Sequence, residues 1–116
     1  MTNTAELLTS FVGREYPAPH GCVNLAAEVL RTVYGLPIPP QPALDAFNII
    51  RNYMRPVEAP AAGDVVLLRG EQWHVAVATG PDTMIHAAPP AGQVVIDDIT
   101  GLQWRARTRG YYRWIQ

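Results

Sequence analysis

The sequence predicts an α+β domain in which N-terminal helices pack on an antiparallel sheet of about five strands. Apolar residues recur at helical spacing before Pro56, whereas short apolar runs separated by turn residues follow Gly63. The chain has 116 residues, 48% of them hydrophobic and 16% charged, which is enough for one core and too little for two ordinary ones. We therefore expect a single domain over residues 1–116.

Charge and hydropathy exclude several classes of function. The net charge is −1 and the isoelectric point is near 6.3, so there is no electrostatic footprint for nucleic acid or an anionic membrane. No apolar run approaches the roughly 18 residues of a membrane span, and the N-terminus lacks a basic start followed by an apolar segment. We expect no signal peptide, synthesis in the cytoplasm, no cofactor, and no nucleic-acid or membrane partner.

Capping signals and apolar spacing predict three helices in the first half of the chain. Asn3 and Glu6 are spaced like a capping box, and Pro42 suits the first turn of a helix. The predicted helices cover residues 4–12, Cys22 to Gly35, and residues 43–53.

Five apolar segments bounded by turn residues predict strands. They cover residues 64–69, 73–79, 83–87, 93–97 and 110–115. The first is a continuous apolar run, as expected of a central strand covered on both faces. The second and third are separated by a loop of hairpin length, so we expect them to pair antiparallel.

The only cysteine, Cys22, stands where a helix begins. The first N–H groups of a helix lack intrahelical partners and carry the positive end of its dipole, which favours a thiolate there. Cys22 is therefore a candidate nucleophile. The alternative interpretation is a buried structural thiol, because free cysteine is among the most buried residue types.

The predicted hairpin brings two histidines together. With a loop over residues 80–82, facing residues have numbers that sum to 162, which makes His74 and His86 diagonal neighbours on one face. Such neighbours lie roughly 7–8 Å apart at Cα. The other residues of this face are small: Ala76, Ala78 and Ala88. We expect the start of the Cys22 helix to fill the space beside them.

This convergence predicts a thiol-dependent hydrolase. Cys22 would be the nucleophile, His74 the general base, and His86 the group that orients His74. The N–H of Cys22 and the hydroxyl of Tyr16 are candidates for holding the oxyanion, and His20 for contacting substrate. The alternatives are an edge histidine at position 74, a structural hydrogen bonder at 86, and a solvated loop residue at 20.

Four motifs in order match a known family. Gly-Cys-Val-Asn-Leu at 21–25 looks like its nucleophile motif, 60–66 like the proline-glycine-aspartate start of its first strand, 73–77 like its general-base strand, and 84–87 like the strand of its third polar residue. In these motifs the chain resembles the NlpC/P60 cysteine peptidases, papain-like hydrolases of bacterial cell-wall peptides. The resemblance runs from about Gly13 to Trp114.

The resemblance implies cleavage of a peptidoglycan stem-peptide amide, typically next to D-glutamate and a diamino acid. Tyr16 falls where members often carry an active-site tyrosine, and Gly21 stands where an aspartate usually precedes the cysteine. Residues 104–114 are similar to members encoded in phage tail modules. This implies a peptidoglycan peptide as substrate, and phage tail or other delivery proteins as partners in a phage or phage-like particle.

Two other functions are compatible with these residues. Cys22, His20, His74 and His86 could form a four-ligand zinc site. The fold could also serve as a non-catalytic tail or assembly module.

Three further groups of polar residues are predicted to be structural. We expect Asp64 to cap a turn, Asp97 and Asp98 to be a solvated strand end, and the alternating arginines from Arg105 to be a solvated face.

Overall fold

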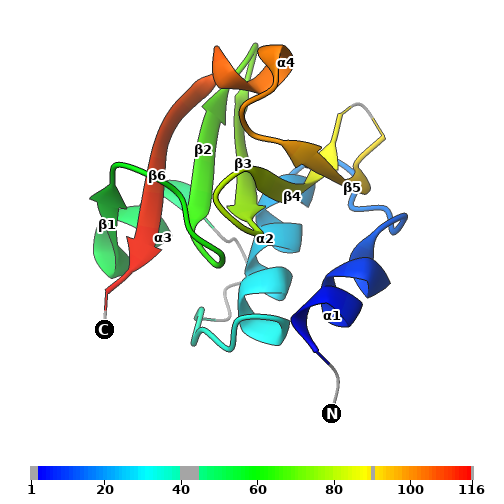
Figure 1. The fold of residues 1–116 in the computed structure, drawn as a ribbon, viewed down its shortest axis with the longest axis horizontal. Helices are drawn as coiled ribbons and strands as arrows, with labels where there is room; N and C mark the ends of the chain where they lie inside the picture. The colour runs from blue at the N-terminus through cyan, green and yellow to red at the C-terminus, as the bar shows by residue number, and fades with distance from the viewer. Residues whose placement is uncertain (1–2, 40–44, 90, 116) are drawn as a thin grey trace.

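The computed structural model describes residues 3–39, 45–89 and 91–115, which form four helices and one antiparallel sheet of six strands (Figure 1). The helices are α1 (Thr4–Phe11), α2 (Gly21–Thr32), α3 (Ala46–Tyr53) and α4 (Leu102–Arg105). The strands are β1 (Met54–Val57), β2 (Val65–Arg69), β3 (Trp73–Ala78), β4 (Thr83–Ala88), β5 (Gln93–Asp98) and β6 (Thr108–Trp114). Their order in the sheet is β1-β6-β2-β3-β4-β5, so the sheet is open.

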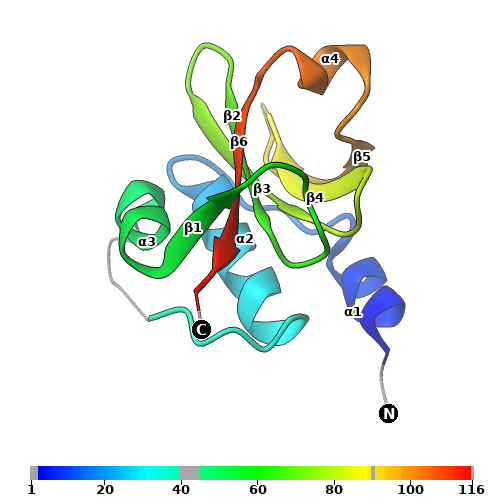
Figure 2. The same cartoon turned by 60° about the vertical axis from the view of Figure 1, so that its left-hand side comes forward.

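The two faces of the sheet are covered by different elements. Side chains of α1, α2 and α3 form one core with alternate strand residues such as Val75, Val77 and Ile85. We call this the helix face. Trp104 of α4 packs on the other side with residues such as Ala76 and Met84, which we call the tryptophan face. In Figure 2, α4 lies near the top, apart from the three longer helices.

Side-chain caps account for the starts of α1 and α3. The predicted capping box is confirmed, since Asn3 Oδ1 accepts the N–H of Glu6 at 2.8 Å and Asn3 Nδ2 donates to the Glu6 carboxylate at 3.1 Å. The third helix starts at Ala46, where Asp45 accepts the N–H of Phe47. Residues 43 and 44 of the predicted helix, with Pro42, lie outside the described residues.

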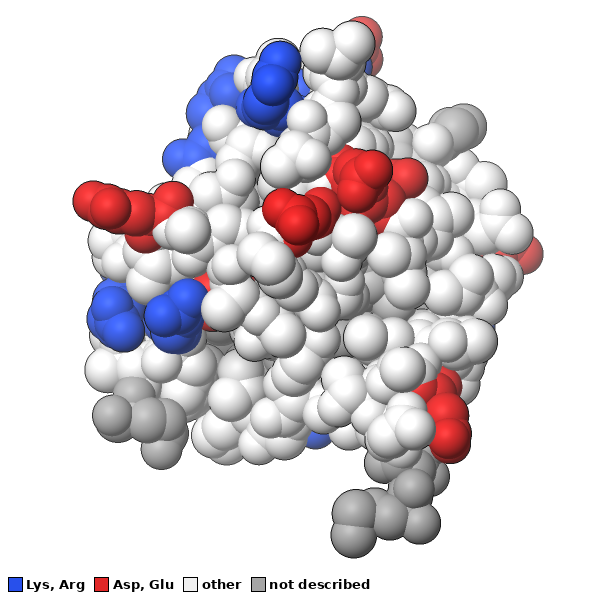
Figure 3. Space-filling model, viewed as in Figure 1, with Lys and Arg blue, Asp and Glu red and all other residues white. Residues whose placement is uncertain are grey.

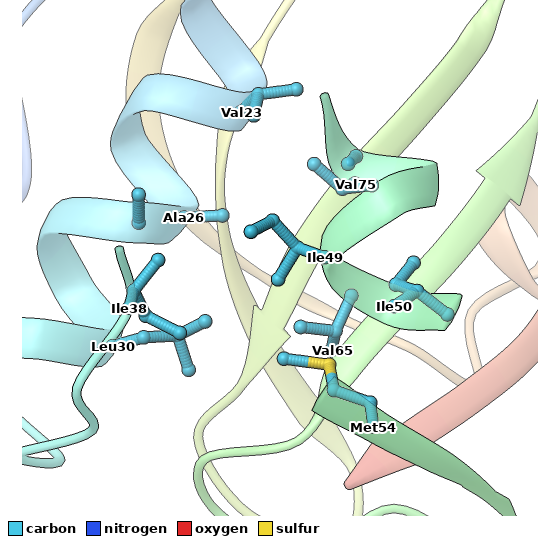
Figure 4. Close-up of a pocket in the computed structure, with 11 residues that line it drawn as sticks. Val23, Ala26, Leu30, Ile38, Ile49, Ile50, Met54, Val65 and Val75 are labelled. Atoms are coloured by element: carbon cyan, nitrogen blue, oxygen red, sulfur yellow. The ribbon is translucent and has the colours of Figure 1, made fainter. Parts of the chain in front are cut away.

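The α3 helix is attached through its apolar side. Ile49 is buried and points into the space between α2 and the sheet (Figure 4). The remaining gap has a volume of about 30 Å³ and is lined only by apolar residues. That is room for about two water molecules, which would find no hydrogen-bonding partners. We interpret it as a packing gap rather than a binding site.

The predicted hairpin register is confirmed where β3 and β4 pair. Val77 faces Ile85 and Ala78 faces Met84, and both pairs sum to 162. The central position of the strand over 64–69 is also confirmed, because β2 lies between β6 and β3. Within the described residues, every helix is too short or too polar to cross a membrane.

The expectation of about five strands is wrong, because the sheet has six. Met54 begins strand β1 instead of ending a helix, and β1 pairs antiparallel with β6. Pro56 in this segment argues against a strand in the sequence, yet an edge position tolerates the missing N–H. The short helix α4 was also not predicted, since four residues give no periodic signal.

A buried carboxylate joins the start of β2 to β6. Asp64 is 2% exposed, and its Oδ2 accepts the N–H of Ala61, which confirms the predicted turn cap. Arg113 donates to both carboxylate oxygens, at 2.9 and 2.8 Å, a contact that the sequence did not indicate. Its hydrogen bonds to Asp64 raise the pKa of Arg113.

Replacing Arg113 tests how much its contact with Asp64 contributes to stability. Arg113→Met should lower the free energy of unfolding, because the buried carboxylate of Asp64 loses its two-pronged partner. Urea unfolding of both proteins measures the difference. Arg109→Met is the matched control on the same strand, and its exposed side chain should contribute about 0.5 kcal/mol or less. Equal stability of the Arg113 variant and the control would contradict this role.

Candidate functional site

The start of α2 presents Cys22 without a side-chain cap. His20 is the N-cap residue, has left-handed backbone angles (φ 68°), and makes no capping hydrogen bond through its side chain. Cys22 is partly buried and is a free thiol. The first N–H groups of α2 therefore remain available to a ligand beside the sulfur.

The glycine before Cys22 is required by a close backbone contact. A Cβ on Gly21 would lie 1.8 Å from the carbonyl oxygen of Tyr16, and one on Gly92 would lie 2.1 Å from the same atom. The Tyr16 N–H also donates to the Gly92 carbonyl at 2.8 Å. The Tyr16 backbone is thus held between two glycines, so no larger side chain fits at position 21.

The hydroxyl of Tyr16 is engaged away from the sulfur. It donates to the carboxylate of Glu28, which follows Cys22 by six residues in the same helix. Six helical residues span about 9 Å along the axis. Burial and the bond to Glu28 raise the pKa of Tyr16. The oxyanion role of this hydroxyl stays a prediction, and its partner in the structure is Glu28.

The two histidines are brought together as predicted, and His86 also contacts a third residue, Asp97. His74 Nε2 lies 2.9 Å from His86 Nδ1, and His86 Nε2 lies 2.7 Å from Asp97 Oδ2. His86 is fully buried, whereas the side chain of Asp97 is 39% exposed. The expectation that Asp97 is only a solvated strand end is wrong. Imidazole, imidazole and carboxylate form one hydrogen-bonded chain.

The sequence held a signal for Asp97 that the hairpin argument did not use. His86 faces Val95 across β4 and β5, so Asp97 is its diagonal neighbour on the same face. Extending the facing-residue count across the turn before β5 would have placed this carboxylate beside the ring.

Trp104 covers the histidine pair on the tryptophan face. Its ring is stacked at 6.0 Å from that of His74 and lies edge-on at 4.9 Å from that of His86. Burial lowers the pKa of His74 to about 4, with the nearby His86 as the second cause. His74 is therefore a neutral imidazole at pH 7.

The expectation that the Cys22 helix fills the space beside the alanines is wrong. Ala76 and Ala78 pack with Trp104, whereas α2 packs on the helix face. Residues alternate between the faces of a strand, and the branched side chains of β3 offer α2 the larger apolar surface. Among the described side chains, no hydrogen bond joins Cys22 to either histidine.

A pocket lies beside the start of α2 and includes Cys22 in its lining. Its volume is about 360 Å³, within the range of small-ligand sites. Trp73 and Val75, which flank His74 in β3, both line it, whereas His74 itself is not among the lining residues. The complete lining, which we call the Cys22 pocket, is His20, Cys22, Val23, Asp45, Ala46, Phe47, Leu67, Trp73 and Val75.

Exposed aromatic rings form the rim of the Cys22 pocket. Phe47 and Trp73 are 38% and 43% exposed and meet edge-to-face with centroids 5.2 Å apart. Arg69 lies over the Trp73 ring at 4.9 Å. Figure 3 shows basic side chains gathered at the end of the molecule where α4 lies in Figure 1. The rim therefore combines two apolar rings with the positive charge of Arg69, while Asp45 adds a carboxylate to the lining.

A profile of the NlpC/P60 family matches residues 12–113. The chain belongs to the NlpC/P60 family. No curated protein matches it in a sequence comparison. Membership of the NlpC/P60 family indicates a cell-wall peptidase or amidohydrolase, and the family generally comprises cysteine peptidases.

The ligand arrangement in this NlpC/P60 domain does not favour the zinc alternative. His20 and Cys22 line the pocket, whereas His74 and His86 bond to each other under Trp104. In the part of the chain that the structure describes, no three His, Cys, Asp or Glu side chains are arranged to hold a metal ion.

The low pKa of His74 predicts a pH-dependent stability. The unfolded chain binds this proton near the ordinary pKa of about 6.5 and the folded chain only near 4, so stability falls as pH decreases between these values. From pH 7 to pH 5 this amounts to about 2 kcal/mol, which His74→Gln should remove. Urea unfolding at both pH values measures it, with His20→Gln, at an exposed site, as control. An equally steep loss in the His74 variant would refute the explanation.

Proposed function

We propose that this NlpC/P60 domain is a thiol-dependent peptidase that cleaves an amide bond in peptidoglycan stem peptides. One observation carries the proposal. His74, His86 and Asp97 form one hydrogen-bonded chain. The residues on either side of His74 in β3, Trp73 and Val75, line the pocket that contains the only cysteine. The physical basis of the proposal is that a thiol becomes a useful nucleophile when a neutral imidazole can take its proton.

The proposed reaction assigns one role to each residue. Cys22 Sγ attacks the amide carbon while its proton passes to Nδ1 of His74, because Nε2 of that ring is occupied by His86. The imidazolium then donates this proton to the leaving amine, and water hydrolyses the resulting thioester. Catalytic hydrogen bonds are often long in a free enzyme and tighten when substrate binds.

The oxyanion would be held by backbone N–H groups at the start of α2. The His20 side chain does not cap this helix, so the N–H of Cys22 remains free for a developing negative charge. We do not assign this role to Tyr16, because its hydroxyl donates to Glu28. His20 lines the pocket and is proposed to contact substrate.

Substrate and delivery extend the proposal beyond the described geometry. The resemblance favours a bond next to D-glutamate and a diamino acid, and Arg69 at the rim suits the carboxylates of such peptides. A papain-like arrangement and incorporation in a phage or phage-like tail are part of this proposal. The C-terminal residues 104–114 support the tail context through their similarity to phage tail members.

One observation favours the alternative of a non-catalytic tail or assembly module. The sulfur of Cys22 makes no hydrogen bond to His74 among the described contacts, as would also hold for an inert thiol on the same fold.

Removing the nucleophile or the base distinguishes these functions. Cys22→Ala and His74→Ala should each lower cleavage of purified stem peptides by at least about 10³-fold, measured by mass spectrometry of the products. Circular dichroism checks that the variants fold. Retained turnover in either variant would refute the assigned roles. A wild-type thiol that reacts with iodoacetamide no faster than a free model thiol, without cleavage, would favour the inert module.

The rim of the Cys22 pocket should determine substrate affinity. Trp73→Ala removes a 43% exposed ring beside the sulfur, so KM should rise roughly tenfold with little change in kcat. Ile96→Ala is the matched control, because Ile96 is also 43% exposed but lies on β5, outside the pocket lining. Steady-state kinetics on the same peptide compare them. Equal KM values for both variants would exclude this pocket from substrate binding.

A further inference from the structure

We propose that Asp97 is a positioning residue that sets the tautomers of His74 and His86. In these tautomers the ring nitrogen whose lone pair remains free is Nδ1 of His74. The use of that lone pair in catalysis rests on the proposed function, whereas the tautomers themselves do not. Asp97 is not one of the residues that line the Cys22 pocket, and its hydrogen bond is to His86, so its effect passes through the two rings.

The first step follows from the chemistry of a carboxylate. An ionised carboxylate only accepts hydrogen bonds. Asp97 Oδ2 lies 2.7 Å from His86 Nε2, so the hydrogen between them belongs to the imidazole. Asp97 therefore holds His86 with its hydrogen on Nε2.

The second step transfers this choice to His74. A neutral imidazole protonated at Nε2 has a lone pair at Nδ1. His86 Nδ1 lies 2.9 Å from His74 Nε2, so His74 must supply that hydrogen. Its own lone pair is then at Nδ1, the atom that the proposed reaction requires.

Among the described residues, no arginine ion pair competes with His86 for the carboxylate of Asp97. Among the ion pairs of the described residues, Asp97 takes part only in the contact with His86, and the arginines found in ion pairs contact Glu28 and Asp64. Trp104 covers both rings, and its π face is a much weaker acceptor than a carboxylate. The hydrogen-bond direction within the pair is thus decided at Asp97.

Histidine ¹⁵N spectra test the tautomers directly, because protonated and lone-pair ring nitrogens resonate far apart. In ¹⁵N-histidine-labelled wild type at pH 7, both His74 and His86 should carry the hydrogen on Nε2. His20→Gln and His74→Gln assign the signals. A hydrogen on Nδ1 of His74, as expected if His86 were protonated on both nitrogens, would overturn the proposal without any variant at Asp97.

Two substitutions and one control test whether Asp97 determines the tautomers of His74 and His86. In Asp97→Ala, His86 can also adopt the Nδ1–H form and donate to His74, so both rings should lose their single-tautomer signals. Asp97→Leu removes every acceptor while it keeps the branched shape of the side chain, and serves if the alanine variant does not fold. Asp98→Ala, which removes the adjacent and exposed carboxylate, should leave the spectra unchanged. Unchanged tautomers in both Asp97 variants would refute the role.

Kinetics then connect the tautomers to turnover. Asp97→Ala should lower kcat roughly 10- to 100-fold with KM changed less than about twofold, whereas Asp98→Ala should match wild type. Partial unfolding alone would also lower the apparent kcat at unchanged KM, but it would leave the tautomers of the folded fraction intact, so the spectra separate the two roles. If wild type lacks activity but the spectra respond as expected, the proposed function fails and the tautomer assignment stands.

Discussion

The site depends on one constraint, which is that side chains along β3 and β4 alternate between the two faces of the sheet. Val75, Val77 and Ile85 face the helices and hold α2 on the sheet. The intervening positions carry His74 and His86 to the opposite face, where Trp104 covers them. The same two strands therefore anchor the nucleophile helix and shield the imidazoles from water. A one-residue register shift would exchange both functions at once.

The loop before Cys22 depends on a second constraint, which is steric. Gly21 and Gly92 leave room for the Tyr16 carbonyl, and a Cβ at either position would overlap it. This explains why position 21 departs from the aspartate usual in the family, since a larger residue would displace the loop. It also explains how β5, distant in sequence, fixes the approach to the nucleophile helix. The Tyr16 N–H bond to Gly92 completes the connection.

The sequence predicted features with local or periodic signals and missed those that depend on tertiary contact. The capping box at Asn3 and the register between β3 and β4 follow from nearest neighbours, so both could be predicted. Strand β1 exists because β6 supplies its partner, although Pro56 argues against it locally. Trp104 reaches the histidines from a helix too short to give a pattern. No such signal relates Arg113 to Asp64, which lie far apart in the sequence.

Burial of His74 makes its ring less basic but keeps a nitrogen lone pair available to accept a proton. With a pKa of about 4, forming its imidazolium at pH 7 costs about 4 kcal/mol, so a resting ion pair with the thiol is disfavoured. The neutral ring, however, always keeps a lone pair ready. A thiolate that develops nearby would itself stabilise the imidazolium, since opposite charges within about 4–6 Å favour the charged form. Proton transfer should therefore accompany attack on bound substrate, when the substrate displaces water and strengthens that attraction, rather than precede it.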